Sequence, residues 1–206
     1  NIYFYQLIQK LSFEDWKEMA ENFGYGSMSG IDLYGEVTGN IPSIEYMNNK
    51  YGKYGWATGN LLTFVIGQGD ILVTPIQVAQ MMNLIASRGN THVPSLHINN
   101  VSNKFTLSLK SSTWDFLQNA VWNVIQHKDG TGKLARIEGA DIHGKTGTAQ
   151  NPHGEDHSWF AGYMAIDNNP VISLSVLVEH GGKGSIQGAM ISRKIFEFFL
   201  QNELIQ

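Results

Sequence analysis

One short segment combines a cation, two hydroxyl groups and a glycine, and it is the part of the sequence best suited to chemistry. Lys145-Thr146-Gly147-Thr148-Ala149-Gln150 is expected to be extended, because residues 141–144 before it are broken by glycine and residues 151–154 after it are typical of a loop. A strand of this composition can present an ammonium and hydroxyls to an anionic substrate. Gly147 has no side chain, so another backbone can come close to it.

The same region fits a phosphate-binding loop by its letters. Residues 139–146 match the pattern G-x-x-x-x-G-K-[ST]. Such a loop must follow a buried apolar strand and open a helix whose N-terminus faces the phosphates. Residues 133–138 are instead mixed in polarity with a helical period, and Gly147 and Pro152 prevent a helix from starting after the motif. We therefore predict a strand rather than a nucleotide-binding loop.

Composition limits the class of protein. The chain has 206 residues, of which 42% are hydrophobic and 16% charged, so it can build a substantial core. The net charge of -4 and the lack of a Lys/Arg cluster argue against nucleic acid as a partner. The absence of cysteine excludes disulfides and zinc-thiolate sites, and it is compatible with an oxidising compartment.

The periodicity of apolar residues predicts helices first, then an antiparallel meander, then a final helix. This order favours an α+β fold, in which helices pack on an antiparallel sheet, over a doubly wound parallel sheet. Thr74-Pro75 is typical of a helix start, and residues 167–170 are typical of a hairpin turn. The expected helices cover residues 3–10, 13–23 and 74–87, with others beginning at Ser43 and Thr113 and one near 191–199; the expected strands cover 61–66, 105–109, 142–148, 158–166 and 171–179.

Six motifs occur in a characteristic order along the chain. They are Gly30-Ile-Asp-Leu33, Ile66-Gly-Gln-Gly-Asp70, Thr74 to Gln80, Lys145 to Gln150, His157-Ser-Trp-Phe-Ala-Gly162 and Val178-Glu-His-Gly-Gly182. With these motifs the chain resembles the class B penicillin-binding proteins, of which the elongation type, penicillin-binding protein 2, is the nearest. Lys-Thr-Gly is the third signature of these enzymes. This resemblance implies the transpeptidase fold shared with serine β-lactamases, in which helices flank an antiparallel sheet.

The sequence departs from the family at its nucleophile. The family uses Ser-x-x-Lys, and no Ser in these 206 residues has Lys three positions later. The second motif, Ser-x-Asn, is also absent as a triplet, and we interpret Asn1 as its last residue, although Asn1 as an ordinary chain start is the competing interpretation. We therefore expect residues 1–206 to be the C-terminal part of a single transpeptidase domain, truncated at its N-terminal side and inactive alone.

The resemblance implies D,D-transpeptidation of peptidoglycan through an acyl-serine intermediate in the parent protein. Lys145 would supply positive potential, and the amide N–H of Thr148 would form half of the oxyanion hole. The hydroxyls of Thr146 and Thr148 would bind the substrate carboxylate, with Gly147 and Gln150 also in the substrate-binding set. The strand would bind the substrate as an added antiparallel strand. Lys145, Thr148 and Asn1 are thus the expected catalytic residues.

The resemblance also implies the partners. These are stem peptides ending in D-Ala-D-Ala, β-lactam antibiotics and the membrane-bound cell-elongation machinery, with no metal or organic cofactor. The parent protein would act in cell-wall synthesis and cell shape on the periplasmic side of the inner membrane, anchored by an upstream segment. Two other functions stay open: a D,D-carboxypeptidase or β-lactamase, in which water is the acceptor, and a non-catalytic penicillin-sensing or scaffold module.

Two polar groups outside the motif have ordinary explanations. His153-Gly-Glu-Asp-His157 resembles a metal cluster, but a loop does not aim both rings as a helix would, so a solvated loop is the better interpretation. Tyr46-x-Asn48 imitates a variant of the second motif, and helical surface is the better interpretation there.

Overall fold

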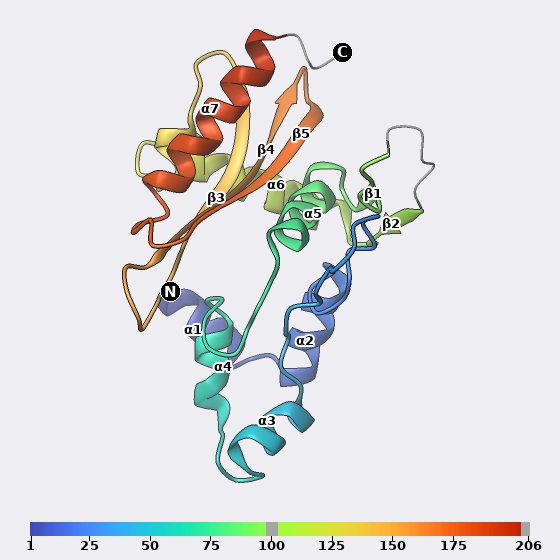
Figure 1. The fold of residues 1–206 in the computed structure, drawn as a ribbon, viewed down its shortest axis with the longest axis vertical. Coiled ribbons are helices and arrows are strands. Elements are labelled where there is room, and N and C mark those ends of the chain that lie inside the picture. The colour runs from blue at the N-terminus through green and yellow to red at the C-terminus, as the bar shows by residue number, and fades with distance from the viewer. Residues whose placement is uncertain (98–102, 203–206) are drawn as a thin grey trace.

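The computed structural model describes residues 1–97 and 103–202 and divides into two lobes (Figure 1). We call residues 1–73 the helical lobe and the described residues from 74 onward the sheet lobe. The helical lobe contains α1 (Ile2–Ile8), α2 (Phe13–Asn22), α3 (Ile44–Tyr51) and α4 (Thr58–Phe64). The sheet lobe contains α5 (Pro75–Ala86), β1 (Asn90–His92), β2 (Lys104–Thr106), α6 (Ser111–Gln126), the 3-10 turn η1 (Lys133–Ala135), β3 (Asp141–Ala149), β4 (His157–Ile166), β5 (Asn169–Val178) and α7 (Gln187–Gln201).

The sheet lobe is built on an antiparallel meander with the order β3-β4-β5. Lys145 pairs with Ala161 and Thr148 with Ser158, so β4 is the central strand and β3 is an edge strand. Asp167 and Asn168 form the β4–β5 turn with φ of 50° and 64°, as a two-residue hairpin turn requires. The meander, the hairpin and the α+β class are confirmed as the sequence predicted.

Helices cover both faces of this sheet (Figure 1). On one face α7 and η1 enclose a cluster centred on Phe160 and Phe196, both fully buried. On the other face α5 and α6 enclose a cluster that includes Trp114 and Tyr163. The sheet is therefore held between two apolar layers, which fixes the position of β3.

The start of α5 follows from its sequence. Thr74 accepts a hydrogen bond from the Gln77 N–H, the Gln77 side chain accepts one from the Thr74 N–H, and Pro75 occupies the first turn. Gln77 is 1% exposed, and its amide also donates to the carbonyls of Ser27 (2.7 Å) and Thr38 (2.8 Å). This one side chain therefore caps the helix and ties the long 24–43 loop to the sheet lobe.

The helical lobe has its own small core. Its cluster contains Ile8, Phe13, Met47, Leu61 and Phe64. Among the residues that the structure describes, no helix is long and apolar enough to cross a membrane.

Two expectations about local structure were wrong. Residues 61–66 do not form a strand: most of them belong to α4, because Leu61 and Phe64, three residues apart, are the positions buried against the cluster. A six-residue apolar run does not by itself distinguish a strand from a helix. The helix expected to be capped by Thr113 starts earlier, at Ser111 with Lys110 at the cap position.

Candidate active site

The candidate site lies on the second half of β3. Lys145 is exposed on one face, and Ile142, Gly144 and Thr146 point to the covered face; Thr148 shares the face of Thr146 but is exposed because it lies near the end of the strand. Residues 141–149 form a strand that is paired with β4 along its whole length. The structure therefore excludes the phosphate-binding loop, as we predicted. The alternation of exposed and buried positions gives β3 one face and one edge that are open to a ligand.

Lys145 has no acidic partner among the described residues. Its Nζ donates to the carbonyl oxygen of Thr146, and desolvation lowers the pKa of the ammonium below its usual value. A lysine without a carboxylate beside it retains its positive potential for an anion or for a neighbouring catalytic group. The geometry is compatible with the predicted role of Lys145.

The two threonine hydroxyls differ in accessibility. Thr146 is 8% exposed, and its Oγ1 lies 2.9 Å from the Oγ1 of Thr131, so its hydroxyl faces the interior. Thr148 is exposed, and its Oγ1 accepts the Gly184 N–H at 3.1 Å. Contact of both hydroxyls with a substrate carboxylate stays a prediction, and the structure presents only the Thr148 side chain at the surface.

A second backbone segment approaches Gly147, but not because Gly147 lacks a side chain. A Cβ built on Gly184 would overlap the carbonyl oxygen of Gly147, so Gly184 is the residue whose missing side chain allows the contact. On Gly147 itself a Cβ would meet the Cβ of Trp159 at 3.2 Å. The segment after β5 is thereby packed tightly against the end of β3.

The outer edge of β3 exposes backbone groups at Thr148. The carbonyl oxygen of Thr148 accepts a hydrogen bond from Gln68 Nε2 at 3.0 Å, so this carbonyl points away from β4. In an antiparallel pair the N–H and C=O of one residue point to the same side. The Thr148 N–H therefore faces the same open edge, where an oxyanion could be bound. Sequence reasoning placed Gln68 in a family motif but gave it no role.

The two other predicted site residues are Asn1, at the start of α1, and Gln150, just after β3. Asn1 is exposed at the start of α1, where its carbonyl accepts the Tyr5 N–H at 3.0 Å, and no described hydrogen bond joins it to β3. Gln150 is exposed just after the end of β3. The helix α1 packs on α4, and the turn that follows α4 carries Gln68, which reaches β3 at Thr148. The catalytic role of Asn1 and the substrate-binding role of Gln150 stay predictions.

The histidine-rich loop after β3 lies against the end of β5 through contacts that involve side chains. The His180 N–H donates to Nδ1 of His157 at 3.0 Å, and the two rings lie 5.1 Å apart. No group of three or more metal-ligating side chains occurs in the described part of the chain. Residues 153–156 lie in the loop between β3 and β4, as we interpreted them, whereas His157 is the first residue of β4.

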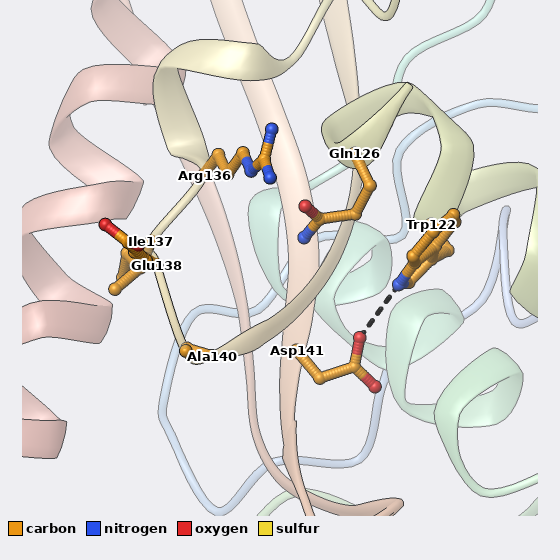
Figure 2. Close-up of a pocket in the computed structure, with 8 residues that line it drawn as sticks. Trp122, Gln126, Arg136, Ile137, Glu138, Ala140 and Asp141 are labelled. Atoms are coloured by element: carbon orange, nitrogen blue, oxygen red, sulfur yellow. Dashed lines mark hydrogen bonds between the residues drawn. The ribbon is translucent and has the colours of Figure 1, made fainter. Parts of the chain in front are cut away.

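A shallow pocket of about 310 Å³ lies at the opposite end of β3 (Figure 2). Its wall includes Trp122, whose indole N–H donates to Asp141 at 2.9 Å, and Arg136. Asp141 precedes Thr148 by seven residues, which corresponds to about 23 Å along a strand. The pocket is therefore separate from the Lys145 site.

Comparisons with known proteins agree on one family. Residues 1–197 match the family model described as "Penicillin binding protein transpeptidase domain". The chain is 28% identical to the peptidoglycan D,D-transpeptidase MrdA of Haemophilus influenzae, over 99% of this chain and 35% of that protein. The chain thus spans about a third of the length of that curated relative.

Solved structures show the same similarity. PBP2 of Pseudomonas aeruginosa in complex with WCK 5153 superposes with a TM-score of 0.87 at 31% identity, covering 99% of this chain and 46% of that one. PBP2 of Helicobacter pylori, in its complex with MreC, superposes with a TM-score of 0.83 at 30% identity, covering 96% of this chain and 38% of that one.

Proposed function

Because the chain belongs to the penicillin-binding protein transpeptidase family and is of the PBP2 (MrdA) type, we propose that it supplies the Lys-Thr-Gly half of the active site of a peptidoglycan D,D-transpeptidase. The family resemblance expected from the sequence motifs is confirmed. On this proposal residues 1–206 form one part of a single transpeptidase domain. The nucleophilic serine belongs to the same protein outside these residues, which contain no Ser-x-x-Lys.

The reaction proceeds by covalent catalysis in two steps. The serine oxygen attacks the carbonyl carbon of the penultimate D-Ala, an ester forms, and the terminal D-Ala leaves as the amine after taking a proton. An amine from a second stem peptide then attacks the ester, forms the new amide and releases the serine. Both steps develop negative charge on the carbonyl oxygen of the penultimate D-Ala, which needs hydrogen-bond donors that are already in position.

The outward-facing backbone of Thr148 on an edge strand is the observation that carries this proposal. Its N–H is available to the oxyanion, and it faces the open edge of β3, beside which a substrate strand can lie. Lys145 stands three residues earlier on the same strand with no acidic partner in the described residues. These groups suit a substrate that is a peptide ending in a carboxylate, and equally a β-lactam that imitates it.

The setting of the protein follows from its substrate. Peptidoglycan is crosslinked outside the cytoplasmic membrane, so we place the domain on that side. Since the similar PBP2 of Helicobacter pylori was solved in complex with MreC, we also propose a partner of the cell-elongation machinery for the longer protein.

The test is acylation by a fluorescent penicillin in the longer protein that carries this chain. We expect stoichiometric, competable labelling of that protein and none of the 206-residue chain. Lys145→Ala should slow labelling by about 10- to 100-fold, the value of losing a charge-assisted hydrogen bond. Lys133→Ala is the matched control, because Lys133 is also an exposed lysine that donates to a backbone carbonyl, at 2.8 Å.

Three results would contradict the proposal in different ways. An adduct on the 206-residue chain would place the nucleophile within it. An unchanged rate in a folded Lys145→Ala protein would show that β3 is not the catalytic strand. Product analysis separates the acceptors: shortened free stem peptides in place of crosslinked dimers indicate a carboxypeptidase, and no turnover with retained labelling indicates a sensor.

A further inference from the structure

The side chain of Gln68 joins the helical lobe to the strand that carries the candidate site. Its Nε2 donates to the Thr148 carbonyl at 3.0 Å, across 80 positions of sequence. Within residues 1–97 and 103–202, this is the single hydrogen bond between the helical lobe and strands β3, β4 and β5. Gln68 therefore contacts Thr148, the residue of β3 whose N–H is the proposed donor to the oxyanion.

The turn that presents Gln68 is fixed on its own lobe. The Gly67 N–H donates to the Phe64 carbonyl at 2.9 Å, and the Gln68 N–H donates to the Thr63 carbonyl at 3.1 Å. Gly67 and Gly69 have φ of 75° and 77°, a conformation that side chains disfavour, so the glycines on both sides of Gln68 are required by the turn.

The residue after this turn is also held. The Asp70 carboxylate is bound by Lys50 and by the Tyr51 hydroxyl at 2.7 Å, and the Asp70 carbonyl accepts the Asn40 amide at 2.7 Å. A turn restrained on both sides behaves as a rigid support. It projects one long side chain, that of Gln68, toward β3.

On the Thr148 side the hydrogen bond restrains a residue at the edge of the sheet. Edge residues lack a ladder partner on one side, so their backbone orientation is less constrained than that of the central strand. Thr148 is held by the Gly184 N–H at its hydroxyl and by Gln68 at its outward carbonyl, and its neighbours Gly147 and Ala149 are paired with β4. Removing the bond from Gln68 frees the carbonyl and, through the same Cα, loosens the direction of the N–H.

We propose that Gln68 is a positioning residue for acyl transfer, which acts by holding Thr148 so that its N–H points to the developing oxyanion. This inference rests on the proposed function and adds a residue from the helical lobe to it. Gln68 touches neither nucleophile nor substrate in this role. The rigid turn makes it a support for the edge of β3.

The experiment measures the rate of acylation by a fluorescent penicillin in the longer protein at saturating label. Gln68→Met keeps the length of the side chain but removes the donor, and it should slow acylation by about fivefold, which corresponds to one hydrogen bond. Gln68→Glu places a carboxylate against the carbonyl at pH 7.5, so two acceptors face each other and the rate should fall by more than about tenfold.

A pH profile separates positioning from a structural role. The usual pKa of Glu is about 4.3, and the facing carbonyl should raise it, because it favours the protonated form. Near pH 4.5 the protonated Gln68→Glu side chain can donate again, so its rate relative to wild type at the same pH should recover toward one. Gln68→Met should show no such recovery. Gln9→Glu is the matched control, because Gln9 is likewise a glutamine whose side chain donates to a backbone carbonyl, that of Tyr5 at 3.0 Å.

Each outcome decides one question. If the wild-type protein takes no label, the proposed function fails and the positioning role falls with it. If the wild type is labelled and all Gln68 variants react at its rate, only the positioning role fails. Faster acylation of Gln68→Met would also overturn it, because the side chain would then compete with the substrate for the Thr148 carbonyl. If Gln68→Met and Gln68→Glu slow acylation by the same factor at every pH, Gln68 has only a structural role, and the positioning role is wrong.

Discussion

The two lobes of the molecule are built in different ways. The sheet lobe has two apolar clusters, one on each face of a sheet whose outer strands flank a largely buried β4. The helical lobe has helices of 7 to 10 residues around a single cluster, and it exposes large apolar side chains such as Ile2 (75%), Tyr34 (103%) and Tyr54 (91%). Helices this short have marginal stability in isolation. The stability of the helical lobe therefore depends more on side-chain packing and on side-chain hydrogen bonds than on hydrogen bonds within its helices.

The difference shows how the candidate site is assembled. The sheet lobe provides the rigid strand on which Lys145 and Thr148 stand, and the helical lobe reaches that strand through Gln68. Damage to the sheet core should therefore affect the whole molecule. Damage to the helical lobe should remain local unless it moves the turn at Gln68.

The largest loss of stability is expected from a truncation in the core that covers the sheet. Phe160 is fully buried between β4 and α7, and Phe160→Ala should destabilise the protein by about 3–5 kcal/mol through lost transfer energy and a cavity. Denaturant unfolding measures this loss. Phe198→Ala removes the same ring from a position that is 56% exposed, and it should change stability by less than about 0.5 kcal/mol. Similar losses for the two variants would contradict the assignment of the core.

A matched truncation in the helical lobe should cost less and remain local. Phe13 is 7% exposed and packs against Trp16, Trp56 and Phe64, so Phe13→Ala should fall at the lower end of the about 3–5 kcal/mol range. Hydrogen exchange should accelerate in α1 to α4 while β3 to β5 keep their protection. Leu11→Ala, at a site 46% exposed, is the control. Equal loss of protection in both lobes would show that they unfold as one unit.

Acid should weaken the helical lobe through Asp70. Burial alone would raise the pKa of Asp70, but hydrogen bonds from Lys50 and Tyr51 outweigh it and hold the pKa below its usual range. A depressed folded pKa means that the stabilisation is complete above the unfolded pKa, about 3.9, and is lost as pH falls through the folded value. Trp fluorescence at Trp16 and Trp56 should report this loss below about pH 4.

The variant Asp70→Asn should abolish this part of the acid dependence. Asp115→Asn, which removes an exposed ion pair with Arg88 in the sheet lobe, is the control and should retain the wild-type slope in the helical lobe. If the stability of Asp70→Asn falls with pH as steeply as that of the wild type, the acid sensitivity comes from other carboxylates.

The smallest loss of stability is expected from exposed ion pairs on helices, and it should be the same in both lobes. Lys17–Glu21 on α2 and Arg193–Glu197 on α7 are exposed pairs four residues apart, each with the basic residue first. Glu21→Gln and Glu197→Gln should each cost no more than about 0.5 kcal/mol, because this orientation is the weaker one and solvent screens it. A loss above about 1 kcal/mol in either variant would mean that the pair belongs to a larger network.

Local patterns in the sequence determined much of the fold. The Thr74-Pro75 start of α5, the hairpin turn within residues 167–170 and the strand at 142–148 each depend on a few neighbouring residues, and the structure agrees with all three. The motif around Lys145 also predicted an exposed cation on a strand. Such features are readable because capping, turn geometry and strand period act within four to ten residues.

Tertiary structure alone decided the remaining features of the site. The run 61–66 became helical because the core of the helical lobe accepts side chains three residues apart, and Thr146 turned inward because Thr131 lies on that side of β3. The contact of Gln68 with Thr148 spans 80 residues, and no local propensity encodes it. The edge position of β3 and the packing of the lobes bring these groups together, since hydrogen bonds between distant segments depend on how the whole chain is packed.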